Sequence, residues 1–262
     1  MRIGLSNMPQ TMHPRPFSQT GLILIELLVA VLISAILIIG LVQIVQASRS
    51  SFRLQESQAE VQENGRYALS TLAKVIRQTG YNPQPWNDLY EPQGITPETL
   101  DGVTSRSDRL AVRFWSNTNC FDNRNPVVDE FGKAAFFIRE SRFDLNDRKD
   151  LTHSCRYGPT AANLVTQVRR EGLVRNVESF QALYARDNDT DGHVDLWVKG
   201  GNWSNEEQII GIRLGLLLSS TDSVVDRVKQ AFTVLDTPYT SPADGRLRLQ
   251  LEFTAAIKGR SG

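Results

Sequence analysis

An apolar run at residues 22–45 constrains this 262-residue chain more than any other feature. Its only polar interruptions are Glu26, Ser34 and Gln43. At about 1.5 Å of rise per residue, a helix of this length crosses the roughly 30 Å hydrocarbon core of a bilayer. A charge inside such a helix disfavours insertion by about 2.5–3.5 kcal/mol, so the Glu26 carboxylate is expected to meet a partner. We therefore predict one transmembrane helix with a functional acidic residue near its start.

The segment before this helix, residues 1–21, has the composition of a processing leader. It contains Arg2, Arg15 and several prolines, and it has no acidic residue and no apolar stretch of its own. Such a segment is typically removed and contributes nothing to the fold. An ordinary secretory signal cut near residues 45–47 and a plain single-pass anchor are the alternatives. The apolar run is longer than the core of a secretory signal, and Glu26 would have no purpose inside one.

The combination of Gly21, the apolar run and Glu26 resembles the type IV prepilin family. In that family the leader ends in Gly at the cytoplasmic face, and the mature helix carries Glu as its fifth residue. The resemblance implies that prepilin peptidase cuts after Gly21 and that Leu22 becomes the N-methylated terminus. It also implies that Glu26 pairs with the terminal amine of a neighbouring subunit and so sets the axial register. Leu22 and Leu24 depart from the Phe and Thr that are more common in the family.

The helix is expected to continue past the membrane to residue 79, because no proline interrupts residues 22–79 and Gly80 supplies a stop. Apolar residues recur on one helical stripe in its far half, which should pack on a sheet. The stripe consists of Leu54, Val61, Ala68, Leu72 and Val75. Whether the helix is straight or melts near Gly40 and Gln43 stays open.

The remaining residues, 80–262, should form one β-rich globular head. Residues 82–108 look irregular because they are rich in Pro, Gly, Asn and Asp. Strand patterns follow at 110–115, 134–139, 164–169, 180–185, 193–198, 209–218 and 247–257. In the last of these, leucines alternate with Arg248, Gln250 and Glu252, which is typical of a half-buried strand. The predicted fold class is α+β, pilin-like, with a long N-terminal spine helix packed on an antiparallel sheet.

The bulk composition excludes some classes of function. The chain has 29 basic and 29 acidic residues, and loss of Arg2 and Arg15 with the leader leaves a mature charge of −2, so no nucleic-acid partner is implied. Cys120 and Cys155, the only cysteines, lie beyond the membrane helix, and in an exported domain they favour one disulfide over free thiols. His153 is expected to have only a surface role.

The one pattern that suits an ion is the segment from Asp187 to Asp195. It places carboxylates at loop positions one, three, five and nine around a glycine at position six, as calcium loops do. The candidate ligands are Asp187, Asp189, Asp191 and Asp195, with His193 contributing its backbone carbonyl. Position twelve lacks the Glu of an EF-hand and the flanks have strand patterns, so we expect an EF-like loop between strands. A solvated Asp-Gly turn is the alternative.

Three further stretches resemble PilW-like minor pilins in particular. Residues 64–69 and 76–81 look like the helix-end signature of that group, and residues 177–181 look like its later motif. The resemblance implies a non-enzymatic minor pilin, held by a single pass in the inner membrane with its head in the periplasm, that primes, caps or joins a type IV pilus. Its implied partners are other minor and major pilins, the pilus assembly platform, prepilin peptidase and a tip adhesin.

Two other functions remain as alternatives. A minor pseudopilin of a type II secretion system would share the helix and the plan of the head. A membrane-tethered calcium-dependent enzyme would need a catalytic set in the head, and no Gly-x-Ser-x-Gly, His-Glu-x-x-His or phosphate-loop motif is present in the sequence.

Overall fold

The computed structural model describes residues 24–87, 90, 93–104, 107–204 and 208–257. Gly21 and Leu22, the predicted cleavage residues, lie outside this range. The chain divides into two compact units, residues 1–50 and residues 51–262, and each is described by itself. The helix α1, Leu24–Gln78, contributes to both.

The helix α1 is continuous over 55 residues, which confirms the predicted spine helix within the described range. It does not break at Gly40 or Gln43. Helix propensity suits this result, because the sequence of α1 contains no proline and few residues that compete for backbone hydrogen bonds. It ends where Thr79 N–H donates to the carbonyl of Ile76 and Gly80 adopts a positive φ of 74°.

The part of α1 in the second unit buries the predicted apolar stripe. Val61, Ala68, Leu72 and Val75 are buried, whereas Leu54 is only partly so. Ile76 extends the stripe by one position and is fully buried. The stripe therefore forms one wall of the hydrophobic core, as its helical spacing predicts.

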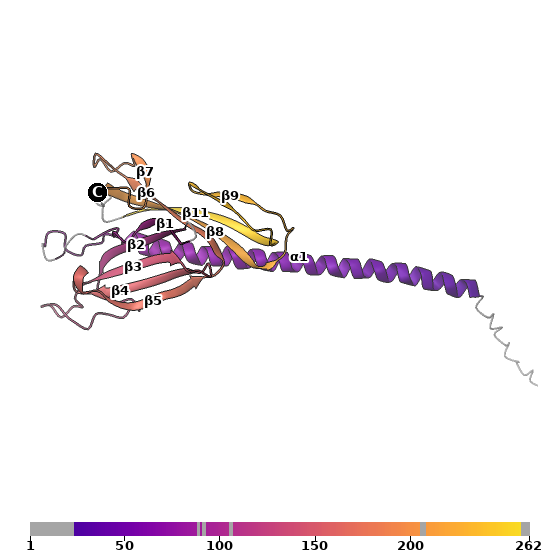
Figure 1. Ribbon diagram of the computed structural model, residues 1–262. Helices are drawn as coiled ribbons and strands as arrows, with labels where there is room; N and C mark the ends of the chain where they lie inside the picture. The colour runs from indigo at the N-terminus through magenta and orange to yellow at the C-terminus, as the bar shows by residue number, and fades with distance from the viewer. Residues whose placement is uncertain (1–23, 88–89, 91–92, 105–106, 205–207, 258–262) are drawn as a thin grey trace, which may run out of the picture. The chain divides into compact units, whose positions relative to one another are not determined.

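A five-stranded antiparallel sheet follows α1 in the sequence, with its strands in simple order (Figure 1). Each strand pairs antiparallel with the next one along the chain. The strands are β1 (Leu100–Thr104), β2 (Ser107–Ser116), β3 (Phe137–Leu145), β4 (Leu151–Gly158) and β5 (Val165–Val174). A short 3-10 helix, Ala161–Asn163, joins β4 to β5.

A second antiparallel sheet contains four strands in the order β11-β8-β6-β7 (Figure 1). Its strands are β6 (Val177–Arg186), β7 (Leu196–Lys199), β8 (Ile209–Ser223) and β11 (Arg246–Ala256). The strands β9 (Ala231–Val234) and β10 (Thr237–Thr240) form a separate hairpin. A β-carbon at Gly215 of β8 would lie 2.7 Å from Val234 Cγ1, so glycine permits the close approach of this hairpin to the sheet.

The two sheets and α1 share one core, which includes Leu72, Val112, Phe143, Phe180 and Leu216. The start of β2 also bonds directly to β6, because Asp108 Oδ2 accepts the Ala182 N–H at 2.8 Å and Ser107 Oγ accepts the Phe180 N–H. Burial raises the pKa of Asp108 to about 6, although two backbone hydrogen bonds act in the opposite direction.

The α+β prediction is confirmed, but the head differs from a single sheet. The predicted strands at 110–115, 164–169, 180–185, 209–218 and 247–257 lie within or nearly coincide with β2, β5, β6, β8 and β11. The prediction at 134–139 overlaps β3 only at its start, and β1, β4, β9 and β10 were not predicted. The expected irregular segment 82–108 contains β1 and the first residues of β2.

Candidate functional site

The membrane-length half of α1 exposes its apolar side chains within the first unit. Their fractional exposure runs from 42% at Val45 to 76% at Leu24. Glu26 lies in the first turn of α1 and is exposed, and the Ser34 hydroxyl donates to the Ala30 carbonyl at 2.7 Å. Within the described residues, α1 is the one helix that is long and apolar enough to cross a membrane. A polar group satisfied inside its own helix is compatible with a lipid environment.

The Asp-rich loop connects β6 to β7, so it lies between strands as predicted. Carboxylate oxygens of Asp187, Asp189 and Asp195 lie within 4.8 Å of one another. The strand predicted at 193–198 begins later, at Leu196, because residues 193–195 complete the loop. The two ends of the loop are joined by Asp195 Oδ2, which accepts the Asn188 N–H at 2.7 Å.

Asp187 is the buried anchor of this loop, with a fractional exposure of 3%. Its Oδ1 accepts the Thr190 N–H at 2.7 Å and its Oδ2 accepts the Gly192 N–H at 2.9 Å. Thr190 and Gly192 have positive φ values of 63° and 84°, so the backbone turns sharply around the Asp187 carboxylate. The Asp187 carboxylate therefore holds the turn of the loop through two backbone hydrogen bonds.

Asp191 and His193 do not join the three converging carboxylates. Asp191 Oδ1 accepts the His193 N–H at 2.8 Å and lies 3.3 Å from His193 Nδ1. The His193 backbone hydrogen bond is the main cause that lowers the pKa of Asp191. Of the five predicted ligand positions, the structure groups the carboxylates of Asp187, Asp189 and Asp195.

The donor set suits a hard divalent cation, since carboxylate oxygens are the ligands that calcium prefers. Each carboxylate oxygen has two lone-pair directions, so the backbone hydrogen bonds to Asp187 and Asp195 leave acceptor capacity for an ion. Three carboxylates this close also repel one another unless a cation or water screens them.

The two cysteines form a disulfide between Cys120 and Cys155. Cys155 lies in β4 and is fully buried, whereas Cys120 belongs to the long connection between β2 and β3. The Cys120 N–H also donates to Gln167 Oε1 at 2.9 Å, so β5 holds the same segment. The cross-link therefore ties an irregular segment to β4, an interior strand of the first sheet.

His153 is not the surface residue that we expected. Its ring stacks on Phe143 with centroids 4.9 Å apart and an interplanar angle of 18°. Burial lowers the pKa of His153 to about 4, and the charge of Arg139 acts in the same direction. Its position in β4, opposite Phe143, places it on the core side of the first sheet as a neutral aromatic side chain.

A buried ion pair in the second sheet was not predicted, because Arg248 was expected on the polar face of a half-buried strand. The Arg248 side chain is 1% exposed and that of Glu178 is 3% exposed. Arg248 Nε and Nη2 donate to the two Glu178 oxygens at 2.7 and 3.0 Å, and Nη2 also lies 2.9 Å from Asp244 Oδ2. This fork geometry fixes β11 to β6 across β8.

The hairpin β9–β10 accounts for this burial, since it contacts the face that the sequence pattern marked as solvent-exposed. Gln250 donates to the Thr233 carbonyl at 2.9 Å, and Thr237 Oγ1 donates to Gln181 Oε1 at 3.1 Å. Burial and the nearby Glu178 raise the pKa of Tyr239, in β10, to about 12. The strands β9 and β10 are only four residues long, and β10 contains a proline. The sequence pattern therefore could not predict that this hairpin covers the polar face of β11.

An apolar groove of about 400 Å³ lies beside α1 within the second unit. β11, which forms one wall, is an edge strand of the second sheet. The groove is lined by Gln62, Arg66, Leu69, Ser70 and Ala73 of α1 and by Leu249, Leu251 and Phe253 of β11. The apolar residues of the β11 wall are the ones that its alternating pattern predicted, whereas the α1 residues of the groove lie beside the predicted stripe and do not belong to it.

A match to one family model supports the resemblance to PilW-like minor pilins. Residues 149–258 match the family model PilW, described as type IV pilus-assembly protein W. A solved type IV-like pilin from Thermus thermophilus is 17% identical, with a TM-score of 0.48, and the alignment covers 80% of this chain and 100% of that one. No curated protein matches the sequence. That family is described as a pilus-assembly protein, in agreement with the expectation that the chain is not an enzyme.

Proposed function

We propose that this chain is a minor pilin of the PilW kind, which primes, caps or joins a type IV pilus. The observation that carries the proposal is the exposed apolar half of α1, whose only charge is Glu26, in a chain whose residues 149–258 match PilW. An exposed apolar surface of this size requires lipid or other apolar helices around it. A pilin helix has both environments in turn, since it is surrounded by lipid in the inner membrane and by other apolar helices in the fibre.

Assembly depends on Glu26 in this proposal. The mature chain begins at Leu22, one turn away, and the Glu26 carboxylate pairs with the terminal amine of a neighbouring subunit among apolar helices. Removing one member of a buried pair costs about 3–5 kcal/mol, so both groups set the axial register. The head lies in the periplasm, where a disulfide such as Cys120–Cys155 is stable. The groove beside α1 gives a neighbouring subunit a second apolar surface.

Processing and assembly are tested together in cells that carry the wild type, Gly21→Ile or Glu26→Gln. We expect the wild-type protein to begin at Leu22 with a methylated amine and to appear in sheared pili. Gly21→Ile should keep its leader and stay in the membrane. Glu26→Gln should be processed normally but be strongly depleted from sheared pili, because the neighbour's amine loses its partner. N-terminal mass spectrometry and immunoblots of sheared fibres give both measurements.

Two controls separate the alternatives. Gly21→Ala should be cut like the wild type, because the position needs only a small residue. A mature terminus at Ser48 would contradict the proposal in favour of an ordinary secretory signal. Loss of protein secretion with normal surface pili in a deletion strain would contradict it in favour of a type II pseudopilin.

We also propose that the β6–β7 loop binds calcium through Asp187, Asp189 and Asp195. The ion would neutralise the converging carboxylates and hold β6 and β7 together. Because it binds only the folded state, calcium at about 100 times its Kd should stabilise the protein by about 2.7 kcal/mol. We expect calorimetry of the full chain in detergent to show a higher Tm in millimolar calcium than in chelator, and a smaller increase in magnesium.

Asp189→Asn and Asp191→Asn form a matched pair for this test. Asp189 belongs to the carboxylate group, whereas Asp191 contacts His193, so only Asp189→Asn should abolish the calcium response. Equal Tm values in calcium and chelator for the wild type would show that the loop is a solvated turn. Equal loss in both variants would show that the ion does not select the three grouped carboxylates.

A further inference from the structure

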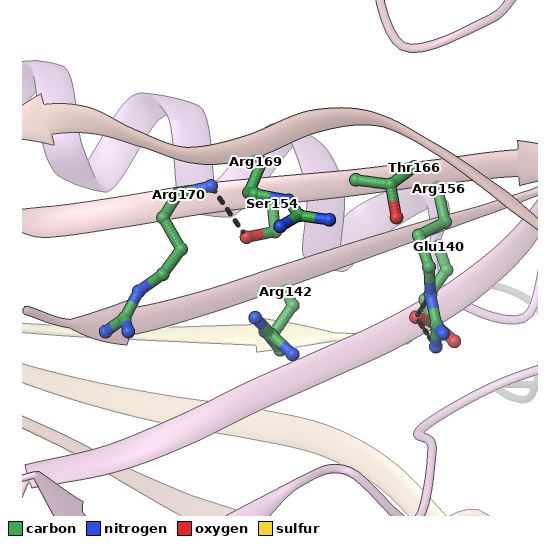
Figure 2. A pocket seen from close by; sticks show the side chains of 7 residues that line it. All are labelled: Glu140, Arg142, Ser154, Arg156, Thr166, Arg169 and Arg170. Carbon is green, nitrogen blue, oxygen red and sulfur yellow. Dashed lines mark hydrogen bonds and ion pairs between the residues drawn. The ribbon is translucent and has the colours of Figure 1, made fainter.

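An arginine-lined pocket of about 300 Å³ lies on the first sheet, on strands β3, β4 and β5 (Figure 2). It belongs entirely to the second unit and is separate from the Asp-rich loop and from α1. Its lining residues are Glu140, Arg142, Ser154, Arg156, Thr166, Arg169 and Arg170. Four arginines and two hydroxyl groups therefore surround one small hollow.

A β-bulge in β5 brings two of these arginines into the pocket. His153 pairs with Glu171 and Cys155 pairs with Val168, so Arg169 and Arg170 together oppose the single residue Ser154. Consecutive residues of a regular strand point to opposite faces, whereas a bulge redirects one of them. Figure 2 shows Arg169 and Arg170 both among the pocket side chains, with the Arg170 N–H donating to Ser154 Oγ at 3.0 Å.

The backbone of Arg170 adopts a positive φ of 46°. Glycine or asparagine suits this conformation, and a long side chain suits it poorly. Strained positions of this kind are typical of functional sites, where the side chain matters more than the backbone preference. An arginine at this strained position therefore suggests that the guanidinium of Arg170 has a function in the pocket.

The carboxylates near the pocket do not balance its positive charge. Glu140 lies between Arg113 Nε and Arg156 Nε at 2.6 Å from each, and Glu98 bonds Arg142 and Arg156 at 3.2 and 2.7 Å. Asp144 lies 3.4 Å from Arg109 and 3.7 Å from Arg170. Within the described part of the chain, Arg169 has no ion pair. Six arginines thus meet three carboxylates around this face.

From this geometry we infer that the pocket binds a tetrahedral oxyanion of the phosphate type. Guanidinium groups donate paired hydrogen bonds to such oxygens, and those of Arg142, Arg169 and Arg170 line the hollow from two strands. Ser154 Oγ accepts from the Arg170 backbone, which leaves its own proton free to donate, and Thr166 adds a second hydroxyl. Donors on several sides suit an anion with three or four oxygens better than one planar carboxylate.

Isothermal titration of the full chain in detergent tests this inference with inorganic phosphate, sulfate and malonate in low-salt buffer. We expect phosphate and sulfate to bind, with affinity that falls as salt rises. Malonate has the same charge as sulfate but planar carboxylates, and it should bind more weakly. Titration with glycerol phosphate shows whether the pocket also binds an esterified phosphate, because an ester fits only if the pocket is open on one side.

The variants Arg169→Ala and Arg170→Gly should each weaken phosphate binding by about tenfold or more, since each removes charge-assisted hydrogen bonds. Arg170→Gly also suits the positive φ, so it should fold at least as well as the wild type. Arg175→Ala removes an exposed arginine just beyond β5 and should leave binding unchanged. An equal loss in Arg175→Ala, no loss in the two pocket variants, or tighter binding of malonate than of sulfate would overturn the inference.

Discussion

Replacing Arg248 by Met should lower the free energy of unfolding by about 3–5 kcal/mol, because Glu178 would then be a buried charge without its partner. The methionine keeps most of the apolar stem, so little packing is lost. Pairing with Glu178 and Asp244 raises the pKa of Arg248 against the lowering effect of burial, so the guanidinium stays charged at every accessible pH. Urea unfolding of the full chain in detergent, followed by fluorescence of the head's tryptophans, measures the loss.

Two companion variants show that the effect comes from the buried charge. Glu178→Met combined with Arg248→Met should recover much of the stability, because an apolar pair of similar volume leaves no uncompensated charge. Arg246→Met changes an arginine on the same strand whose side chain is 39% exposed, and should cost less than about 1 kcal/mol. Similar losses in Arg246→Met and Arg248→Met would contradict the assigned role of the pair.

The helix and most strands of the second sheet were predictable because their hydrophobic patterns match their burial. Leu72 and Val75 follow the 3.6-residue period, and β8 contains an aliphatic run that is buried on both faces. The sequence indicates the motif at residues 177–181 only by its resemblance to PilW-like pilins. The structure gives it a physical reason, since Glu178 pairs with Arg248 and Phe180 is fully buried.

Strand β4 and most of β3 were not predicted, because paired charges, His and Cys occupy their sheet positions. Core-side positions of β4 are occupied by His153, Cys155 and Tyr157, which carry a weaker apolar signal than aliphatic residues. On the opposite face, Glu140 is 2% exposed only because two arginines neutralise it. A hydropathy pattern cannot distinguish such a network from a polar loop, because the pairing partners lie on other strands.

The Asp-rich loop was predictable in position, but which of its carboxylates lie close together was not. The spacing of the carboxylates and Gly192 indicated a tight loop, and Asp187 does organise one with its two backbone hydrogen bonds. Asp191 follows the same alternation but contacts His193, because a local Asx turn satisfies it first. The arginine pocket was not predictable, since the bulge that aligns Arg169 and Arg170 exists only in the paired sheet.

Removing the disulfide should destabilise the head by about 4 kcal/mol. Cys120 and Cys155 are separated by 35 residues, and the loop-entropy relation for a loop of that size gives this value. The connection it restrains has little regular structure of its own, with isolated bridges between Thr118 and Arg124 and between Val128 and Ala134. Reduction should therefore release much of this segment from β4. Intact-mass analysis should detect two alkylatable thiols only after reductant.

The size of the effect is measured by denaturant unfolding of the oxidised wild type, the reduced wild type and a variant with Cys120→Ala and Cys155→Ala. The reduced protein is the important control, because alanine at the fully buried position 155 adds a small packing loss that reduction does not. Asp122→Asn, which weakens surface ion pairs of the same connection with Lys74 and Arg139, should cost less than about 1 kcal/mol. If oxidised and reduced proteins unfold at the same denaturant concentration, the other contacts of this connection already hold it and the cross-link adds no stability.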